Sequence, residues 1–456
     1  MEELRMKRVK IAIIGAGSGV FSINLIKDLC VNENLKNARL ALMDVNQARL
    51  DGIYGMCVRY AQEIGHQLDI SKTTDRIEAI RDADFVINVA LDYGHARLRQ
   101  GWEVAMKHGY RFGGSLHVMH DEAFWVNFHQ LRLMESIAND ILNVCPNAYL
   151  VMVANPVLAG ITYLTRKYPA LKVVGMCHGF NGVRALSEAL GFDHDRDITF
   201  EVSGVNHFIW LTKFLYKGED AYPMLDKWLA DGSYEKYISE FKGVSPAVGP
   251  KSIDLYRRYG VFPIGDTSTP GGGAWGWWYH AEDEKKYLED PFGWYQDYFV
   301  HGEDEVRRIR EAVENPNARM TEVFSSMPSG EPMIPLIEAL ACDVERPVIV
   351  NIPNTYEYVP GLPKDFAVEI KALVSGRGIQ GVHMLPQPKA ITALTYRDRI
   401  APVETELLAY ESGDRRMLEA LIMMDPWTKS LAQAQALIQD ILDLPCNAAM
   451  KEYFER

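Results

Sequence analysis

A thiol, two imidazoles and two amides stand in this sequence beside or within apolar runs. Asn155 follows one run that is long enough for a strand, and Cys177 and His178 follow the next. Asn206 and His207 lie together in the apolar stretch SGVNHFIWL. A cysteine and a histidine that leave coordination positions open suit a divalent transition metal that also binds substrate. The alternative is that these are ordinary buried residues and that the Asn-Pro pair is only a turn.

The elements that must position these residues follow from the alternation of apolar runs and amphipathic segments over about the first 200 residues. This alternation is typical of a parallel sheet covered by helices on both faces. The carboxyl ends of parallel strands share one edge, where doubly wound sheets bind ligands, so we expect Asn155, Cys177 and His178 to converge there. The predicted strands are residues 9–14, 39–43, 85–90, 149–154 and 172–176, and a helix is predicted at 21–29.

The first predicted strand runs into GAGSGVF and then into the helix. Its first glycine permits a tight turn, and its second lets the backbone approach a pyrophosphate at the helix N-terminus. The third glycine of the usual pattern is replaced by valine. An acid at the end of the second strand can accept the adenosine ribose hydroxyls and disfavours a 2′-phosphate, so NAD is preferred over NADP. The predicted cofactor-binding residues are Gly15, Ala16, Gly17, Ser18, Gly19, Val20, Phe21, Asp44 and Asn155.

Helical patterns predominate beyond residue 200, for example at 306–313 and 418–444. We therefore predict an α/β protein in which a Rossmann-like doubly wound sheet, residues 1–200, binds NAD. It is fused to an α+β, mainly helical C-terminal domain, residues 201–456, that carries substrate, metal and subunit contacts. This is the architecture of the lactate and malate dehydrogenases.

Composition excludes several other classes of protein. The chain has 456 residues and a formal net charge of −13, which argues against nucleic acid or an anionic membrane as a partner. No apolar run reaches the roughly 18 residues of a membrane-spanning helix. The apolar IAII behind the charged start is too short for a signal-peptide core. Six cysteines without paired spacing are expected to be reduced thiols, so we predict a cytoplasmic protein.

Several short motifs occur in a fixed order along the chain. GAGS follows the first strand and an acid ends the second, and then come ANP, CHG, GVNH, PIGDT, VNIPN and GLPKDFAVEI. Together, from Val9 to about Tyr453, they resemble family 4 of the glycoside hydrolases. CHG beside GVNH and PIGDT looks most like the branch that acts on non-phosphorylated α-glycosides. That branch includes α-glucosidases, α-glucuronidases and α-galactosidases.

The resemblance implies a glycosidase that depends on NAD and on a metal, typically Mn²⁺. NAD⁺ takes a hydride from C3 of the sugar, and the resulting ketone acidifies the proton on C2. A base removes this proton, the glycosidic oxygen leaves by elimination, water adds, and the hydride returns. The metal polarises the oxygens on C2 and C3.

The resemblance also implies roles for the polar residues at the sheet edge. Cys177 and His207 match the metal ligands of the family. Asn155 is expected to hold sugar hydroxyls near the nicotinamide, and Asn206 is a further predicted substrate contact. His178 matches the residue that protonates the leaving group in some members. The alternative for His178 is that it only orients its neighbours and binds substrate.

The general base is assigned to Asp266 in PIGDT, because the α-glycosidase branch carries an aspartate in this loop. Tyr259 is the second choice, since several relatives use a tyrosine. The alternative for Asp266 is a turn or helix-cap residue. Thr269 stands where that branch carries an arginine, which weakens the case for a uronate substrate. The arginines considered as replacements are Arg97, Arg99 and Arg111.

Two further segments depart from the pattern of the family. The loop STPGGGAWGWWYH after Asp266 is interpreted as an aromatic lid over the sugar, with a hydrophobic plug as the alternative. The segment RFGGSLHVMHDEAF either contacts the sugar or only caps the helix that follows. Its polar residues are His117, His120, Asp121 and Glu122.

The predicted function is hydrolysis of a non-phosphorylated α-glycoside. An α-glucosidase is preferred over an α-glucuronidase, an α-galactosidase or an α-galacturonidase. The expected cofactors are NAD and Mn²⁺, and the expected partners are a small α-glycoside and further copies of the chain in a homodimer or homotetramer. Outside this class, an NAD-dependent 2-hydroxy acid dehydrogenase would need a GEHG-like stretch that the sequence lacks. A non-catalytic NAD-binding sensor would have no need of the metal pair.

Overall fold

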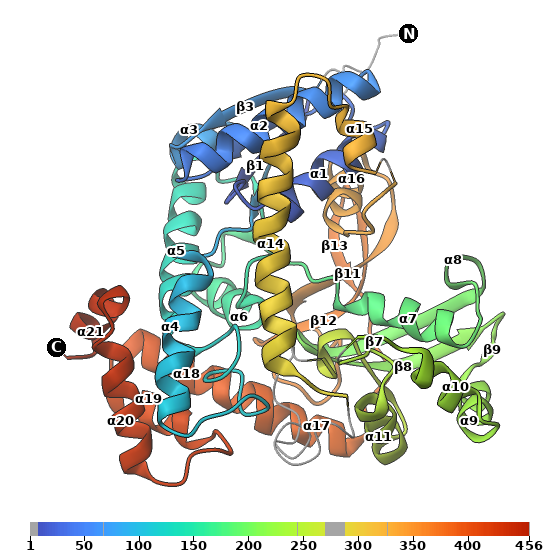
Figure 1. Ribbon diagram of the computed structural model, residues 1–456, viewed down its shortest axis with the longest axis vertical. Helices are drawn as coiled ribbons and strands as arrows, with labels where there is room; N and C mark the ends of the chain where they lie inside the picture. Colours follow the sequence, from blue (N-terminus) through green and yellow to red (C-terminus); the bar gives the residue numbers. More distant parts are fainter. Residues whose placement is uncertain (1–7, 67, 244, 270–287, 326, 456) are drawn as a thin grey trace.

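In the computed structural model, the strands form one mixed sheet that runs through the molecule (Figure 1). The structure describes residues 8–66, 68–243, 245–269, 288–325 and 327–455. In this part of the chain the sheet has 13 strands in the order β10-β8-β7-β12-β11-β6-β5-β4-β1-β2-β3, with β13 beside β12 and β9 beside β8. Their bounds are β1 Lys10–Ile14, β2 Arg39–Met43, β3 Asp69–Thr73, β4 Phe85–Asn88, β5 Tyr149–Met152, β6 Lys172–Gly175, β7 Ile198–Val205, β8 Phe208–Tyr216, β9 Glu219–Asp220, β10 Phe262–Ile264, β11 Arg346–Pro353, β12 Ala367–Ser375 and β13 Gly378–Gly381.

The strands at one end of the sheet, β3-β2-β1-β4-β5-β6, are parallel. Strand β1 is buried on both faces: Ile11 and Ile13 belong to one core, and Ala12 and Ile14 belong to the other. Because helices cover both faces, such strands read as continuous apolar runs. The predicted Rossmann-like doubly wound sheet is confirmed.

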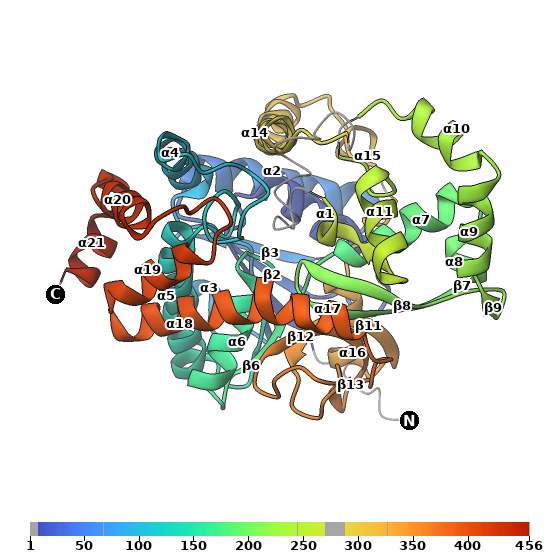
Figure 2. The same cartoon turned by 90° about the horizontal axis from the view of Figure 1, so that it is seen from below.

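Helices lie on both faces of this sheet, and the C-terminal helices α17 to α21 lie along one side of the molecule (Figure 2). Helix α14 packs against α1 and α2, α18 packs against α6, and α20 packs against α4. The bounds in the first half are α1 Gly19–Val31, α2 Gln47–Ile64, α3 Arg76–Ile80, α4 Gly94–Lys107, α5 Phe124–Val144, α6 Val157–Lys167, η1 Gly179–Asn181, α7 Gly182–Ala189, α8 His194–Asp197, α9 Tyr222–Ala230 and α10 Ser233–Glu240. Those in the second half are α11 Pro250–Tyr259, η2 Gly265–Thr267, α14 Pro291–Glu314, α15 Met320–Val323, α16 Met333–Cys342, α17 Lys389–Thr395, η4 Tyr396–Ile400, α18 Ala401–Ser412, α19 Arg415–Met423, α20 Leu431–Leu442, η5 Pro445–Asn447 and α21 Ala448–Phe454.

The second half of the chain extends the same sheet. Strand β11 runs antiparallel to β6, with Asn351 paired to Gly175. Strands β12, β7, β8 and β10 follow, each antiparallel to its neighbour. The C-terminal half is therefore α+β and rich in helices, as predicted. The boundary near residue 200 stays a prediction.

The parallel part of the sheet contains one strand that was not predicted, and the structure divides one predicted helical segment. Strand β3 was not predicted, because its sequence DISKT is largely exposed and lacks an apolar run. The helical pattern predicted at 418–444 forms two helices, since α19 ends at Met423 and α20 begins at Leu431. The break contains Pro426, which has no N–H to donate within a helix. The side chain of Ser430 then caps α20 by accepting from Gln433 N.

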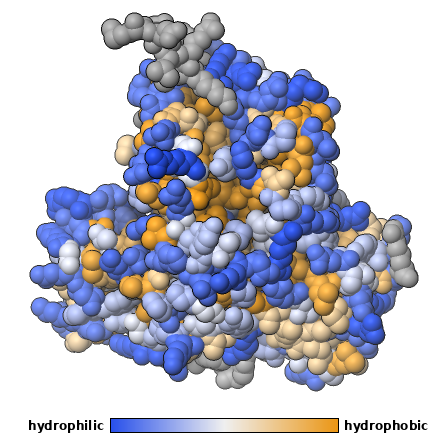
Figure 3. Space-filling model, turned by 180° about the vertical axis from the view of Figure 1, so that it is seen from behind, coloured by the Kyte–Doolittle hydropathy of each residue, from blue (hydrophilic) through white to orange (hydrophobic). Residues whose placement is uncertain are grey.

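The cysteines, the helices and the surface each bear on the predictions made from composition. All six cysteines are free, as predicted. None of the helices in the described part of the chain combines the length and apolar character that crossing a membrane requires. On the back of the molecule, apolar side chains gather toward the middle of a mostly polar face (Figure 3). Contiguous apolar regions are typical of contact surfaces, but the homo-oligomer stays a prediction.

Candidate functional site

The glycine turn lies between β1 and α1 and is shaped by close backbone contacts. Gly15 has a φ of 89°, and a Cβ there would lie 2.6 Å from the Cα of Ala90. The N–H of Gly17 donates to Asp44 Oδ2 at 2.8 Å, and a Cβ on Gly17 would lie 2.7 Å from this oxygen. Glycine is therefore required at position 15, whereas a side chain at position 17 would displace the Asp44 carboxylate that binds the turn.

A cavity of about 720 Å³ opens beside this turn. Of the predicted cofactor-binding residues, Gly15, Gly17, Ser18, Gly19, Val20 and Asp44 line it. Ala16 is instead packed in the apolar core, Phe21 packs against that core, and Asn155 lies with the polar network described below. The turn, the helix N-terminus and the acid at the end of β2 together fit a dinucleotide.

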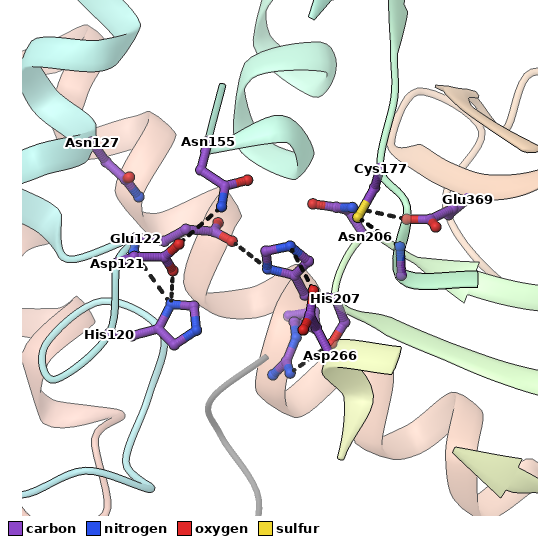
Figure 4. A network of polar contacts seen from close by, with 12 residues as sticks. His120, Asp121, Glu122, Asn127, Asn155, Cys177, Asn206, His207, Asp266 and Glu369 are labelled. Atoms are coloured by element: carbon purple, nitrogen blue, oxygen red, sulfur yellow. Dashed lines mark hydrogen bonds and ion pairs between the residues drawn. The ribbon is translucent and has the colours of Figure 1, made fainter. Parts of the chain in front are cut away.

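Three potential metal donors from distant parts of the chain meet at the carboxyl edge of the sheet (Figure 4). Cys177 follows β6, His207 forms the two-residue turn between β7 and β8 together with Asn206, and Asp266 lies in η2. The Sγ of Cys177, a ring nitrogen of His207 and a carboxylate oxygen of Asp266 lie within 4.8 Å of one another. One sulfur, one nitrogen and one oxygen donor fit a divalent transition metal with positions left for substrate.

Two glycines allow these loops to approach each other. Gly265 has a φ of 55°, and a Cβ there would lie only 2.2 Å from the carbonyl oxygen of Gly179. A Cβ on Gly182 would lie 2.5 Å from the nitrogen of Gly265. Any larger residue at position 265 would therefore push the Asp266 loop away from the Cys177 loop.

The His207 ring is held on both sides. Its Nδ1 lies 3.0 Å from Glu122 Oε1, and its Nε2 lies 3.6 Å from Asp266 Oδ2. Burial lowers the pKa of His207, but contacts with Cys177 and Glu122 outweigh it and raise the pKa well above its ordinary value. Burial raises the pKa of the Cys177 thiol, Glu369 adds to the effect, and His207 opposes it. A cation bound between them would favour the thiolate.

A second polar group lies beside the first (Figure 4). His120 Nδ1 lies 2.7 Å from Asp121 Oδ1, and Asn155 Nδ2 donates to Asp121 Oδ2 at 3.0 Å. Asn155 therefore lies beside the donor group, and its predicted contact with the substrate stays a prediction. The alternative that this segment only caps the next helix is wrong, because α5 begins after Ala123 without a side-chain cap. Its residue Glu122 instead contacts His207.

Asn206 contacts a buried acid that the sequence did not single out. Its Nδ2 donates to Glu369 Oε2 at 2.8 Å, and Asn351 donates to the same oxygen at 3.3 Å. Burial raises the pKa of Glu369 to about 7. The available signal was an acid placed between apolar residues in the segment AVEIKALV of β12. The predicted substrate contact of Asn206 stays a prediction.

The remaining predicted catalytic residues, His178 and Tyr259, lie in different settings. His178 is exposed, and its Nδ1 lies 3.2 Å from Glu331 Oε1. The hydrogen bond with Glu331 raises the pKa of His178, which favours the protonated ring that an acid requires. The ring of Tyr259 packs edge-on against Trp210. The hydroxyl of Thr269 donates to Asp266 Oδ1 at 2.8 Å, so the residue in place of an arginine holds the predicted base.

Of the three arginines considered as replacements, Arg97 is excluded. It is buried, bonded to the carbonyl of Cys446 and to Asn447, and paired with Asp92. Arg99 lines the cavity beside the glycine turn. Arg111 lies over the ring of Trp427. The loop with Trp275, Trp277 and Trp278 lies outside the described residues.

The fold and site define a dinucleotide-binding α/β protein with a group of metal donors at the carboxyl edge of its sheet. The model of the family 4 glycosyl hydrolases matches residues 10–191, and the model of their C-terminal domain matches residues 202–428. The chain belongs to family 4 of the glycosyl hydrolases, and it is a glycosidase.

Relatives of similar length carry several sugar specificities. The chain is 25% identical to an α-galacturonidase of Thermoanaerobacterium saccharolyticum, with 95% of each chain covered. It is 24% identical to an α-galactosidase of Bacillus subtilis, covering 95% of this chain and 96% of the relative. It is 23% identical to an α-glucosidase of Erwinia rhapontici, covering 91% and 93%.

Solved structures share the fold. A 6-phospho-α-glucosidase from gut microorganisms, in complex with NAD and Mn²⁺, has a TM-score of 0.77 at 18% identity, covering 96% of this chain and 98% of its own. A 6-phospho-β-glucosidase from Thermotoga maritima, with manganese, NAD⁺ and glucose-6-phosphate, has a TM-score of 0.75 at 17% identity, covering 98% and 99%. A malate dehydrogenase of Cryptosporidium parvum has a TM-score of 0.52 at 15% identity, covering 89% and 99%. The predicted dehydrogenase-like architecture is confirmed.

Gly265→Ala should separate the two loops that bring Cys177 and Asp266 together. Gly260→Ala is the matched control, since its φ of 72° is also left-handed but no atom lies within 4 Å of a Cβ there. In both variants the free energy of unfolding should fall by about 1–2 kcal/mol, because alanine is less favourable than glycine in the left-handed region. Only Gly265→Ala should lose more than this and also bind Mn²⁺ more weakly, as measured by urea unfolding and metal titration. Equal effects in the two variants would show that the close approach is unimportant.

Cys177→Ser and His207→Ala should each abolish stoichiometric Mn²⁺ binding and leave the fold intact. The loss should exceed the roughly 10- to 100-fold that removal of an outer-shell partner costs. Metal content after equilibrium dialysis and circular dichroism measure the two properties. Cys342→Ser, on α16, is the control and should bind as the wild type does. Full metal occupancy in either variant would remove that residue from the ligand set.

Proposed function

We propose that the protein hydrolyses non-phosphorylated α-glycosides by reversible oxidation at C3, with NAD and Mn²⁺ as cofactors. The observation that carries the proposal is the meeting of Cys177, His207 and Asp266 at the same sheet edge as the glycine turn. Direct displacement at the anomeric carbon would need neither a dinucleotide nor a soft metal ligand. The α-galacturonidase, α-galactosidase and α-glucosidase among the relatives support the α-glycosidase branch.

The two cofactors would occupy neighbouring parts of the site. Gly15 would keep the turn tight, Gly17 and Gly19 would let the backbone at the N-terminus of α1 approach the pyrophosphate, and Asp44 would accept the ribose hydroxyls. Cys177 and His207 would hold the metal. When bound, NAD⁺ supplies reversible hydride transfer at C3, and the metal supplies polarisation of the neighbouring sugar oxygens.

The chain itself supplies the proton transfers. Asp266, held by the hydroxyl of Thr269, would accept the proton from C2. His178, with its pKa raised by Glu331, would donate a proton to the leaving oxygen. Asn155, fixed by Asp121, would orient the sugar hydroxyls. Tyr259 remains the second choice for the base.

The preferred sugar is a neutral glucoside. A uronate carboxylate would be expected to bind an arginine. Thr269 stands where the arginine of the branch would be, and Arg97 is bonded to Asn447, so only Arg99 and Arg111 remain of the cations considered. The second candidate is an α-galacturonidase, which the 25% identical relative from Thermoanaerobacterium saccharolyticum supports. The 2-hydroxy acid dehydrogenase is not preferred, since the likeness to malate dehydrogenase concerns the fold. A cytoplasmic location and a homodimer or homotetramer remain part of the proposal.

Asp44→Ala should weaken NAD⁺ binding, because it removes both the ribose partner and an acceptor for Gly17 N. Asp44→Asn should keep an acceptor for this turn and lose only the charge. The asparagine variant should therefore narrow the difference in affinity between NAD⁺ and NADP⁺ by about 1.4 kcal/mol or more, a factor of ten. Fluorescence titration with both dinucleotides measures this. Unchanged NAD⁺ affinity in Asp44→Ala would mean that Asp44 does not bind the ribose.

Hydrolysis of p-nitrophenyl α-glycosides in D₂O tests the proposed reaction. If C2 is deprotonated before the bond breaks, deuterium should appear at C2 of the released sugar, C3 should keep its hydrogen, and no net NADH should accumulate. Asp266→Asn should slow C2 exchange by about 10²- to 10⁴-fold. Nuclear magnetic resonance of the product at low conversion measures the label, with the free sugar incubated with the enzyme as control.

Two results would contradict this proposal: cleavage in D₂O without label at C2, or cleavage after complete removal of NAD⁺. If Asp266→Asn instead exchanges the C2 proton at the wild-type rate, Tyr259 becomes the candidate for the base.

A further inference from the structure

The side chain of Glu122 faces the His207 ring from the side opposite the donor group (Figure 4). Glu122 Oε1 lies 3.0 Å from Nδ1, and Asp266 Oδ2 lies 3.6 Å from Nε2. Nε2 is therefore the ring nitrogen that points toward Asp266. Both side chains are buried, with 7% of His207 and 2% of Glu122 exposed.

We propose that Glu122 is a positioning residue that holds His207 with Nδ1 protonated and Nε2 directed at the metal. The proposal rests on the proposed function, because it takes the metal to bind at Cys177 and His207. A histidine that binds a metal through one nitrogen commonly donates the N–H of the other to a carboxylate. That contact fixes both the tautomer and the orientation of the ring and makes the ligating nitrogen more basic.

The backbone of His207 is held separately from its ring. His207 lies in a two-residue hairpin turn and has a φ of 58°, which is uncommon for residues other than glycine. The buried guanidinium of Arg399 donates to the carbonyl oxygen of His207 at 3.4 Å, which holds the backbone of the turn. The contact with Glu122 holds the ring on the side away from the donors.

The position of Glu122 in the chain explains how it reaches this ring. It lies in the loop before α5, next to Asp121, whose carboxylate contacts His120 and Asn155. Successive side chains of this loop thus serve different partners. The potential metal donors that group with Glu122 are His120 and Asp121, whereas Cys177 groups with His207 and Asp266. Its action on the metal site is therefore through His207.

Glu122→Gln tests the proposal with Co²⁺ as the probe, because the absorption spectrum of bound cobalt reports its ligands. The variant keeps the size of the side chain and removes the charge. We expect it to bind Co²⁺ about 10- to 100-fold more weakly, with the thiolate-to-cobalt band retained. Glu122→Asp, which keeps the carboxylate on a shorter stem, should recover part of the affinity.

Glu406→Gln is the matched control. Glu406 makes a similar buried contact, with its Oε1 3.2 Å from His117 Nδ1, and it also accepts from Asn127. This variant should bind Co²⁺ as the wild type does. Urea unfolding of the metal-free proteins should show that Glu122→Gln loses no more stability than Glu406→Gln. A merely structural role of Glu122 would instead lower the stability without a selective loss of Co²⁺ affinity.

The same Co²⁺ titration distinguishes a failure of the role proposed for Glu122 from a failure of the proposed function. If the wild type binds Co²⁺ no more tightly than Cys177→Ser, the metal site itself is wrong and the proposed function fails. If the wild type binds Co²⁺ through Cys177 and Glu122→Gln binds equally tightly, only the role of Glu122 is wrong. A spectrum in Glu122→Gln that shows a lost ligand or a changed coordination number would make Glu122 a direct ligand and overturn the positioning role.

Discussion

The close approach of two loops at the carboxyl edge of the sheet is the constraint on which the site depends. Gly265 and Gly179 lie so close that a Cβ on Gly265 would stand 2.2 Å from a carbonyl oxygen. This contact brings η2 beside the end of β6, so that Asp266 can approach Cys177. Without this contact, the thiol, the imidazole and the carboxylate would be too far apart to bind one metal ion.

The continuous sheet makes this approach possible. Cys177 follows the last parallel strand of the N-terminal half, whereas His207 follows β7 and Asp266 follows β10, two antiparallel strands of the second half. The pairing of β6 with β11 joins the two halves in one sheet, so the dinucleotide cavity and the donor group are held by one rigid framework. Sites built on such strand ends keep reacting groups in register better than sites on long loops alone.

Electrostatics explains why a cation fits this place. The site gathers several carboxylates and a thiol around the imidazoles of His207 and His120 in buried surroundings, where an unpaired charge is costly. His120 and Asn155 balance Asp121, and two amides serve Glu369. The pKa of Cys177 is nevertheless raised, and a divalent cation between Cys177 and His207 would stabilise its thiolate.

The sequence by itself determined the parallel strands, the glycine turn with Asp44, and the residues Cys177, His207 and Asp266, because each is marked by a local pattern or motif. It did not reveal Glu122 as the partner of His207, Glu369 as the partner of Asn206, or the engagement of Arg97 with Asn447. Only the tertiary structure decided these roles. A carboxylate or guanidinium has the same chemistry wherever it stands in a chain, and its role depends on groups that folding brings to it from far away in the sequence.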